Sequence, residues 1–348
     1  TFTYSSEPSA TFECRLIPLE SAFSTCPSGS KPYSGVPEGN YAFEVRAKDA
    51  AGNLDPTPAS SLVTVDTTPP TISNLQGPPP LTNSNQANFS WTNQDNLSPI
   101  NSALCHLVNV DPAFRSCSTL TSDAIANVPE GANTWHVKIR DEAGNESVVS
   151  EYSWTTDYTA PGATIVNKPA RYTNQTTVTF TYQSDNGTAT FECQLSPVEG
   201  AFSSCPATGK TYSGLNEGNY TFRVRARDPA GNVGAPDAYD FTVDTTPPQI
   251  QINSRTPSGD FINQTSVSIA FSGTDNLSPF KFQCQLVGRD PNFRDCTSPD
   301  VLSGLTEGLW TWQLRGVDDA GNQSAPLAEN WTVDLTPPTV SITSLDPG

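Results

Sequence analysis

The stretch SGLNEGNYTFRVRARDPAGN, residues 213–232, decides how the rest of the chain is interpreted. From Tyr220 to Ala226 every second residue is apolar, which is the period of a β-strand with one buried face. An EG pair precedes this strand and DPAGN follows it, and both are turn signals. Similar stretches are SGVPEGNYAFEVRAKDAAGN from Ser34, ANVPEGANTWHVKIRDEAGN from Ala126 and SGLTEGLWTWQLRGVDDAGN from Ser303. Four copies of one strand and its turns predict four copies of one domain.

The composition sets limits on the class of protein. With 348 residues, 31 Pro and 23 Gly, the chain is expected to form several domains of short strands rather than helices. No apolar run approaches the roughly 20 residues that span a membrane. The chain has no Met and no signal peptide at Thr1, so we expect a mature or excised piece whose export signal lies elsewhere. The net charge of −18 argues against a nucleic-acid partner.

The eight cysteines form four pairs with eleven residues between partners in each pair. Zinc sites use closer spacings and usually histidine, and the chain has only His106 and His136. One pair in each repeat predicts four local disulfides, each closing a β-hairpin, and an extracellular or cell-surface location. The predicted pairs are Cys14 with Cys26, Cys105 with Cys117, Cys193 with Cys205, and Cys284 with Cys296.

The same landmarks divide the chain into repeats. In the third copy, apolar alternation predicts strands at 178–182, 191–195 and 239–243 in addition to the central strand. About seven short strands with turns between them indicate an antiparallel sandwich. The predicted Ig-like repeats are residues 1–68, 69–159, 160–246 and 247–336, with 337–348 as the first strand of a further repeat. Repeat 1 is predicted to lack its own first strand.

The motif L-x-E-G-x-Y-x-F-x-V-R-A-x-D-x-A-G-N resembles the penultimate strand and hairpin of fibronectin type III domains. The whole repeat, with its Cys pair and V-D-T-T-P-P close, resembles the bacterial Ig-like repeats of large secreted and cell-surface proteins. This resemblance covers essentially the whole chain and implies an all-β fold of tandem Ig-like (fibronectin III-like) antiparallel β-sandwiches. Tyr41 and Tyr220 occupy the tyrosine-corner position. Asn133 and Trp310 replace them, so the resemblance does not predict that hydrogen bond in repeats 2 and 4.

The repeats are of two kinds. Repeats 1 and 3 share TFEC, whereas repeats 2 and 4 share DNLSP, and the equivalent cysteines of like repeats are 179 residues apart. The repeating unit is therefore a block of two domains. Pro-rich linkers such as DTTPP leave almost no slack between domains, since Pro fixes φ. We expect neighbouring sandwiches to stack as an extended, semi-rigid rod.

Carboxylates are predicted to gather where one repeat meets the next. The last strand of a sandwich ends at the pole opposite the penultimate hairpin, so each linker Asp should meet loops of the following repeat. Oxygen ligands of this kind suit calcium, and calcium-binding repeats occur in the resembled class. The alternative is that Asp and Asn only form turns. The candidate ligands are Asp66, Asp95, Asp141 and Asn145; Asp157, Asp185, Asp228 and Asn232; and Asp244, Asp275, Asp318 and Asn322.

We find no catalytic motif in the sequence. His106 and His136 are interpreted as incidental polar residues of strands, and Trp135, Trp310 and Trp312 fall on the apolar period and are expected in the core. Calcium is the only cofactor considered. The sequence therefore predicts a structural, non-catalytic segment of an extracellular stalk or filament, adhesin-like or fibre-like, whose partners are neighbouring repeats or copies of itself. The alternatives are a glycan-binding or protein-binding module, or an accessory segment of a secreted enzyme.

The C-terminal residues alternate in the same way as a first strand, with Val340 and Ile342 on one side. Two explanations remain open. The sequence is a window cut from a longer array of repeats, or this strand completes repeat 1 of another copy. Both predict that the missing strand of repeat 1 is supplied by residues like Val340 and Ile342.

Overall fold

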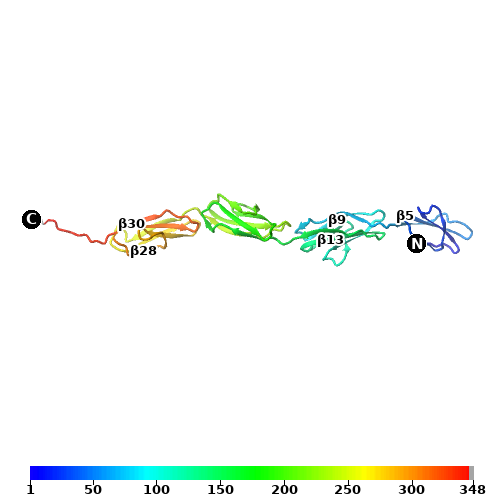
Figure 1. Cartoon of the computed structure of the whole chain (residues 1–348), viewed down its shortest axis with the longest axis horizontal. Helices are drawn as coiled ribbons and strands as arrows, with labels where there is room; N and C mark the ends of the chain where they lie inside the picture. The colour runs from blue at the N-terminus through cyan, green and yellow to red at the C-terminus, as the bar shows by residue number, and fades with distance from the viewer. Residues whose placement is uncertain (345–348) are drawn as a thin grey trace. The chain divides into compact units, whose positions relative to one another are not determined.

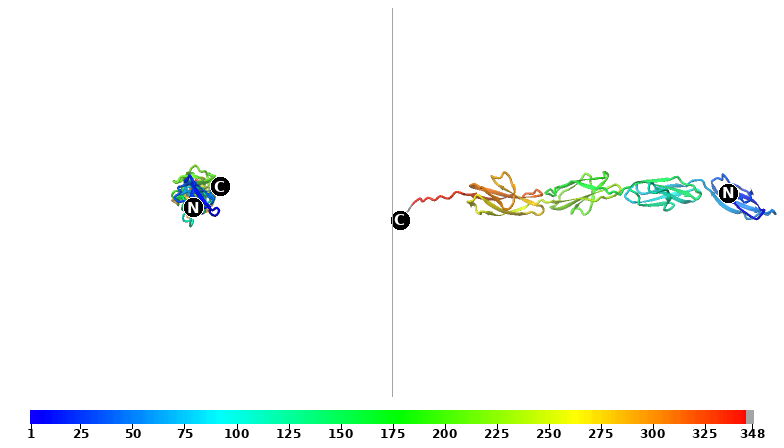
Figure 2. Two further views of the ribbon diagram at one scale, coloured as in Figure 1. Left: turned by 90° about the vertical axis from the view of Figure 1, so that its right-hand side faces the viewer. Right: turned by 90° about the horizontal axis from the view of Figure 1, so that it is seen from below.

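A computed structural model describes residues 1–344, all of which form strands, turns or loops. The chain divides into two compact units, Thr1–Thr159 and the part that begins at Ala160, which are described separately. Each unit contains two repeats, and each repeat consists of two layers of strands (Figures 1 and 2). Among the described residues there is no helix that could cross a membrane.

Repeat 3 shows the complete sandwich. The sheet β15-β17-β20 faces the sheet β16-β22-β21-β18-β19. Side chains from both sheets meet in one core, where the rings of Phe180 and Phe222 stack with 4.0 Å between their centres. Its strands are β15 (Ala163–Asn167), β16 (Tyr172–Thr173), β17 (Val178–Ser184), β18 (Thr190–Ser196), β19 (Ser203–Cys205), β20 (Lys210–Tyr212), β21 (Gly218–Arg227) and β22 (Asp237–Val243).

The first strand of each complete repeat is divided in two, which the sequence did not predict. In repeat 3, β15 pairs antiparallel with β17, whereas β16 pairs parallel with β22 in the other sheet. Pro169 lies between the two parts. Because Pro has no N–H to donate to a sheet, the ladder stops there and the chain changes layers. The divided strand gives eight strands in each complete repeat rather than about seven.

Repeats 2 and 4 have the same topology as repeat 3 (Figure 1). Repeat 2 contains β7 (Thr71–Gln76), β8 (Leu81–Thr82), β9 (Gln86–Gln94), β10 (Ile100–Leu107), β11 (Arg115–Ser116), β12 (Ser122–Ala126), β13 (Gly131–Asp141) and β14 (Ser150–Thr156). Repeat 4 contains β23 (Gln249–Thr256), β24 (Phe261–Ile262), β25 (Val267–Thr274), β26 (Phe280–Leu286), β27 (Arg294–Cys296), β28 (Asp300–Leu302), β29 (Gly308–Asp318) and β30 (Leu327–Val333). Trp135 and Trp312 are fully buried as predicted, but Trp310 is only half-buried.

Repeat 1 has a smaller sandwich. Its strands are β1 (Phe2–Thr3), β2 (Thr11–Ile17), β3 (Ser24–Cys26), β4 (Ser30–Lys31), β5 (Gly39–Lys48) and β6 (Ala59–Val65). The sheet β1-β4 faces the sheet β3-β2-β5-β6, and within residues 1–344 no strand lies beside β1 where β15 lies beside β17. The predicted further strand at 337–348 forms no strand up to residue 344, and residues 345–348 lie outside the described part. Val340 and Ile342 are 97% and 85% exposed.

Candidate functional site

All eight cysteines form disulfides, and each disulfide lies within one repeat and closes its hairpin. The Cα atoms of the partners are 5.1–5.8 Å apart, and no free cysteine is present in the described chain. The first cysteine of every pair is completely buried. A loop of this size contributes about 3 kcal/mol in the chain-entropy account. The chain therefore has four covalently braced domains with no thiol available for catalysis among residues 1–344.

An aromatic residue of each braced hairpin lies over a cation of the central strand. The guanidinium carbon of Arg225 is 4.2 Å from the centre of the Phe202 ring, and Arg315 lies 4.2 Å from Phe293. Repeat 1 has the equivalent contact, and repeat 2 uses Lys138 over Phe114. Such contacts contribute about 0.5–1 kcal/mol at exposed sites, so they hold the hairpin against the outer face of the sheet.

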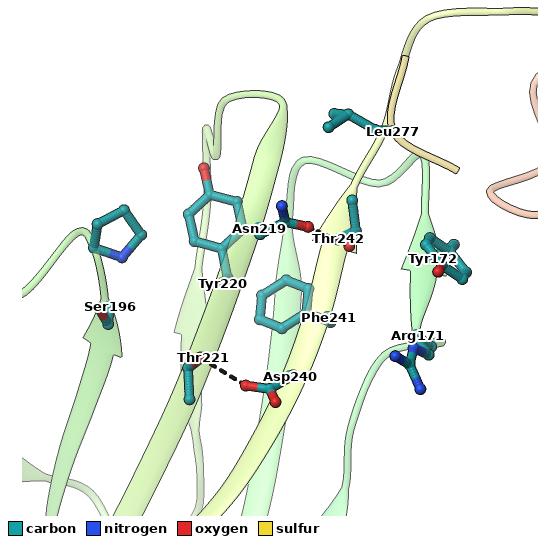
Figure 3. A pocket seen from close by; sticks show the side chains of 11 residues that line it. Arg171, Tyr172, Ser196, Asn219, Tyr220, Thr221, Asp240, Phe241, Thr242 and Leu277 are labelled. Atoms are coloured by element: carbon teal, nitrogen blue, oxygen red, sulfur yellow. Dashed lines mark hydrogen bonds between the residues drawn. The ribbon is translucent and has the colours of Figure 1, made fainter. Parts of the chain in front are cut away.

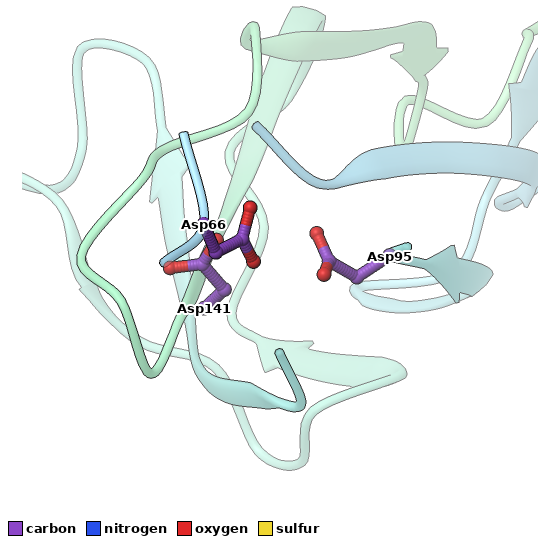
Figure 4. A group of neighbouring side chains, drawn as sticks. All are labelled: Asp66, Asp95 and Asp141. Atoms are coloured by element: carbon purple, nitrogen blue, oxygen red, sulfur yellow. The ribbon is translucent and has the colours of Figure 1, made fainter. Parts of the chain in front are cut away.

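Three of the predicted carboxylates do converge at the junction between repeats 1 and 2. Asp66, Asp95 and Asp141 each place one oxygen within 4.8 Å of the others. Figure 4 shows the three carboxylates facing a common space. Asp66 and Asp141 are 8% and 0% exposed. The linker of one repeat and two loops of the next therefore meet as the sequence predicted.

The turn that contains Asp141 explains how this junction is held. Asp141 Oδ1 accepts hydrogen bonds from the backbone N–H groups of Gly144 at 2.7 Å and Asn145 at 2.8 Å. Gly144 has φ = 100°, which the tight turn requires and which other residues rarely adopt. The turn aims the Asn145 amide in two directions, since Nδ2 donates to Asp141 Oδ2 at 2.8 Å and to the Asp66 carbonyl at 3.2 Å. A turn residue of repeat 2 thus binds the linker of repeat 1.

The DNLSP segment supplies the other side of the junction. Asp95 Oδ1 accepts the N–H groups of Leu97 at 3.0 Å and Ser98 at 2.9 Å, which is a local turn. The turn directs the Ser98 hydroxyl to the linker, where it donates to Asp66 Oδ2. Both loops of repeat 2 therefore hydrogen-bond to the same linker residue.

The junction between repeats 3 and 4 is built in the same way. Asp244, Asp275 and Asp318 converge within 4.8 Å, and the Ser278 hydroxyl donates to Asp244 Oδ2. Asn322 Nδ2 donates to the Asp244 carbonyl at 2.8 Å and to Asp318 Oδ2 at 2.8 Å. The two units thus contain one junction each with the same hydrogen-bond pattern.

One carboxylate oxygen at each junction has no donor. Oδ2 of Asp95 and Oδ2 of Asp275 are buried and make no hydrogen bond. Burial raises the pKa of Asp244, and the nearby charge of Asp275 adds to this, although hydrogen bonds from Ser278 and Thr246 oppose it. Burial also acts to raise the pKa of Asp141, but hydrogen bonds from Asn145 and Gly144 leave it below its usual value. Buried anionic oxygens without donors fit a hard cation such as Ca²⁺.

The remaining predicted ligands belong to different units. Asp157 lies in the first unit, whereas Asp185, Asp228 and Asn232 lie in the second. Within the second unit, Asp185 Oδ1 accepts the N–H of Gly162 at 2.8 Å, and Asp228 Oδ2 accepts Asn232 Nδ2 at 2.8 Å. Asp228 and Asn232 form the same turn as Asp141 and Asn145, whereas Asp185 binds the start of its repeat, and the site that would combine these residues stays a prediction.

The tyrosine-corner hydrogen bond occurs in all four repeats, so the expectation for repeats 2 and 4 was wrong. Tyr220 Oη donates to the Asn216 carbonyl at 2.7 Å, as the resemblance implied. Asn133 Nδ2 donates to the Pro129 carbonyl at 3.0 Å, and Trp310 Nε1 donates to the Thr306 carbonyl at 2.8 Å. Any side chain with a donor that reaches the carbonyl four residues back can satisfy this corner.

Repeats 2 and 4 contain a buried polar network that the sequence did not predict. Asp123 is 2% exposed and accepts hydrogen bonds from Trp135 Nε1 at 3.2 Å and from Arg115 at 2.8 Å. In repeat 4, Asp300 accepts Trp312 Nε1 at 2.8 Å and Arg294 at 2.8 Å. A buried tryptophan N–H usually finds a partner, but Nε1 of Trp91, Trp154 and Trp331 is buried without one, so the sequence does not show which tryptophans are paired.

The two histidines were also missed as a pair. His106 of β10 and His136 of β13 are directly opposite in the sheet, and their ring centres are 5.8 Å apart. No turn signal in the sequence determines the register between these strands, so their proximity could not be predicted from spacing alone.

Two surface grooves are candidates for ligand binding. A groove of about 530 Å³ on repeat 3 is lined by Arg171, Tyr172, the β21 residues 219–221, the β22 residues 240–242 and Leu277 (Figure 3). Its polar groups pair with one another, since Thr221 donates to Asp240 at 2.6 Å and Thr242 donates to Asn219 at 2.7 Å. These pairs engage the hydroxyl groups of Thr221 and Thr242.

The second groove, of about 590 Å³, lies on repeat 1 and exposes part of its core. Val45 and Ala47 line it and are half-buried, whereas their counterparts Val224 and Ala226 in repeat 3 are fully buried. In repeat 3, Ala163 and Ile165 of β15 pack against that core. The groove of repeat 1 thus has the position that a first strand occupies in repeat 3.

Comparison with known proteins supports this description of the chain. Residues 159–245 match the family described as Bacterial Ig-like domain, and residues 32–91 match Bacterial Ig-like domain (group 3). The second match begins in the middle of repeat 1, includes β5 and β6, and runs into repeat 2. The chain is a tandem array of Ig-like, fibronectin III-like β-sandwich repeats.

The proteins to which this chain is similar are of several different kinds. Exoglucanase B of Cellulomonas fimi is 26% identical over 299 residues, a match that covers 79% of this chain and 26% of that protein. This chain therefore spans about a quarter of the length of that relative. A tetra-tandem repeat from the extending region of a large adhesion protein is 17% identical, with 96% of this chain and 94% of that chain covered and a TM-score of 0.38. The fibronectin(III)-like modules of Clostridium thermocellum CbhA are 17% identical, with 50% and 93% covered and a TM-score of 0.30.

Proposed function

We propose that this chain is a structural, non-catalytic segment of an extracellular stalk or filament, in which the repeats act as a semi-rigid spacer. The observation that carries the proposal is the hydrogen bonding of the linker at Asp66 and Asp244. Each linker carbonyl accepts an amide of the following repeat, and each linker carboxylate accepts a serine hydroxyl of that repeat. A linker bound on both its backbone and its side chain resists bending, which suits a spacer and is not required for catalysis.

The four disulfides support an extracellular location, because such bonds persist in oxidising compartments. Peptide mapping of native material without reduction tests this part of the proposal. We expect four cross-linked peptides, each joining the two cysteines of one repeat. Free thiols at most positions, or a peptide that joins Cys26 to Cys105, would contradict it.

Calcium at the two described junctions is part of the same proposal. The ion would bind the donor-free Oδ2 of Asp95 or Asp275 together with the other carboxylates of each cluster. Calorimetric titration of the full chain with Ca²⁺ should give at least two sites. The double variant Asp95→Asn and Asp275→Asn keeps the turn-forming oxygen and should lose both sites.

Asp49→Asn is the matched control for the calcium experiment. Asp49 forms in repeat 1 the turn that Asp141 forms in repeat 2, with Oδ1 accepting the Asn53 N–H at 2.8 Å, but it belongs to neither described carboxylate cluster, so it controls for the loss of one turn carboxylate. This variant should bind Ca²⁺ like the original chain. An equal loss of binding in both variants, or no binding by the original chain, would leave these aspartates as turn formers only.

We also propose that the groove of repeat 1 accepts a strand of the Val340–Ile342 type. The groove leaves Val45 and Ala47 half-buried, and the proposed strand exposes Val340 and Ile342. A peptide of residues 337–344 should bind the full chain, and the same peptide with both apolar residues replaced by Asp should not. Loss of binding in a Val45→Asp variant would place the peptide in this groove. Failure of the unchanged peptide to bind would contradict the proposal.

A second candidate is an accessory segment of a secreted enzyme, which the similarity to Exoglucanase B favours. Antibodies against the repeats can isolate the native polypeptide for electrophoresis under reducing conditions. This candidate predicts a polypeptide well above 37.2 kDa that hydrolyses a glucan. A large polypeptide without that activity would favour the stalk or filament.

A further inference from the structure

The outer face of the five-stranded sheet in repeat 2 carries a row of three potential metal ligands. His106 of β10 is directly opposite His136 of β13, and His136 is directly opposite Glu151 of β14. Side chains at directly opposed positions project from the same face of a sheet. These are the only two histidines in the chain, and both lie in this row.

The three groups lie close enough to share an ion after a small movement of their side chains, although their donor atoms do not all lie within 4.8 Å of one another in this structure. A metal that binds one nitrogen of each of two imidazoles at about 2.0–2.1 Å holds the ring centres about 5 Å apart. The rings of His106 and His136 are 5.8 Å apart, so a small side-chain rotation brings them into range. Glu151 Oε2 already lies 3.5 Å from His136 Nε2. Two imidazoles and one carboxylate form a donor set typical of zinc and related ions.

The surroundings orient these groups and leave a nitrogen available. His106 Nε2 lies 3.1 Å from the Asp111 carbonyl oxygen, which can only accept, so Nε2 is the donor there and Nδ1 is the nitrogen that would bind the ion. The Phe114 ring lies 5.3 Å from the His106 ring and 6.5 Å from the His136 ring, so it covers one side of the pair. The nearby cation Lys138 is ion-paired with Glu146 at 2.8 Å, which reduces its repulsion of a metal.

The row is specific to repeat 2. Its equivalents in repeat 4 are Gln285, Gln313 and Ala328, which occupy the same register positions. In repeat 3 the equivalents are Gln194, Arg223 and Ala238, and in repeat 1 they are Arg15, Glu44 and Ser60. The sandwich therefore forms without these ligands. We propose that His106, His136 and Glu151 bind a divalent transition-metal ion of the Zn²⁺ type.

Calorimetric titration of the full chain with Zn²⁺ tests the proposal, with excess Ca²⁺ present to occupy sites that consist only of carboxylates. The double variant His106→Gln and His136→Gln introduces the residues that repeat 4 already has, so repeat 2 should still fold. We expect one Zn²⁺ site in the original chain and at least a hundredfold weaker binding in the double variant. Glu151→Ala, the repeat 4 residue, should weaken binding about tenfold.

A matched control and a spectroscopic readout locate the ion. Gln313→Ala changes the equivalent position in repeat 4 and should leave Zn²⁺ binding unchanged. The imidazole ¹⁵N resonances of both histidines should shift together at one equivalent of Zn²⁺. Absence of a Zn²⁺ site, or equal binding by the original chain and the double histidine variant, would overturn the proposal. A shift of only one histidine would also overturn it, since the ion would then not be shared.

Discussion

The contribution of the linker hydrogen bond can be isolated by comparing Asn322→Ala with Asn53→Ala. Both asparagines close the same turn, and each amide donates to the aspartate four residues earlier, at 2.8 Å for Asn322 and 2.7 Å for Asn53. Only Asn322 of this pair also donates to the carbonyl of a preceding linker residue, Asp244, at 2.8 Å. The difference between the two variants therefore measures the junction rather than the turn.

The expected magnitudes follow from these hydrogen bonds. Loss of one exposed bond costs about 0.5–1.5 kcal/mol, so Asn53→Ala should destabilise repeat 1 by about 1 kcal/mol. Asn322→Ala loses the same bond and also leaves a part-buried linker carbonyl without its donor, which costs about 1–2 kcal/mol more. We therefore expect repeat 4 to lose about 2–3 kcal/mol of unfolding free energy.

Amide hydrogen exchange of the full chain resolves the repeats and measures both effects. Amides of β29 report the opening of repeat 4, and those of β5 report the opening of repeat 1. Because Asn322→Ala loses more unfolding free energy, its acceleration of exchange in β29 should exceed the acceleration in β5 caused by Asn53→Ala roughly 5–30-fold. Equal accelerations in the two variants would refute the claim that the linker bond couples neighbouring repeats.

Three further predictions concern single repeats. Burial acts to raise the pKa of Asp123, but Arg115 holds this pKa below its usual value. The carboxylate therefore stabilises repeat 2 above about pH 4, and this contribution is lost as the pH falls through the lowered pKa. Melting temperatures of the original chain and of Asp123→Asn should differ at pH 7 and converge near pH 2. Phe202→Ala removes the ring under Arg225 and should lower the stability of repeat 3 by about 1 kcal/mol in chemical denaturation, whereas Phe202→Tyr should have little effect. Trp310→Phe should cost repeat 4 about 0.5–1.5 kcal/mol through the lost corner hydrogen bond, with a further loss because the smaller ring packs less well against the core, and an unchanged melting temperature would show that the bond contributes nothing.

Local patterns in the sequence were sufficient to predict most of the fold. Alternation from Tyr220 to Ala226 predicted a strand, and β21 extends from Gly218 to Arg227. Constant cysteine spacing predicted the four disulfides that the structure contains. The division of the first strand into β15 and β16 was missed, because the change of layer depends on which sheet each short segment joins rather than on its own residues.

The candidate sites were predicted less completely. The proximity of Asp66 and Asp141 could be predicted from the direction of the strands, because the linker of one repeat must meet the loops of the next. The donor-free oxygen of Asp95 was not predictable, because it depends on the position of every neighbouring donor. The His106–His136 pair depends on the register between β10 and β13, which a sequence without an explicit turn signal does not determine.

Small-angle X-ray scattering of the full chain in calcium-containing buffer tests the proposed spacer most directly. The longest strands have eleven residues, so each sandwich is about 37 Å long and four in line would extend about 150 Å. A rod of that length has a radius of gyration of about 40 Å by the same dimensions, whereas a compact chain of 348 residues would have about 20 Å. We predict a value near 40 Å that falls in the Asn145→Ala and Asn322→Ala double variant as the junctions loosen. A value near 20 Å, or a radius of gyration that the double variant leaves unchanged, would contradict the account.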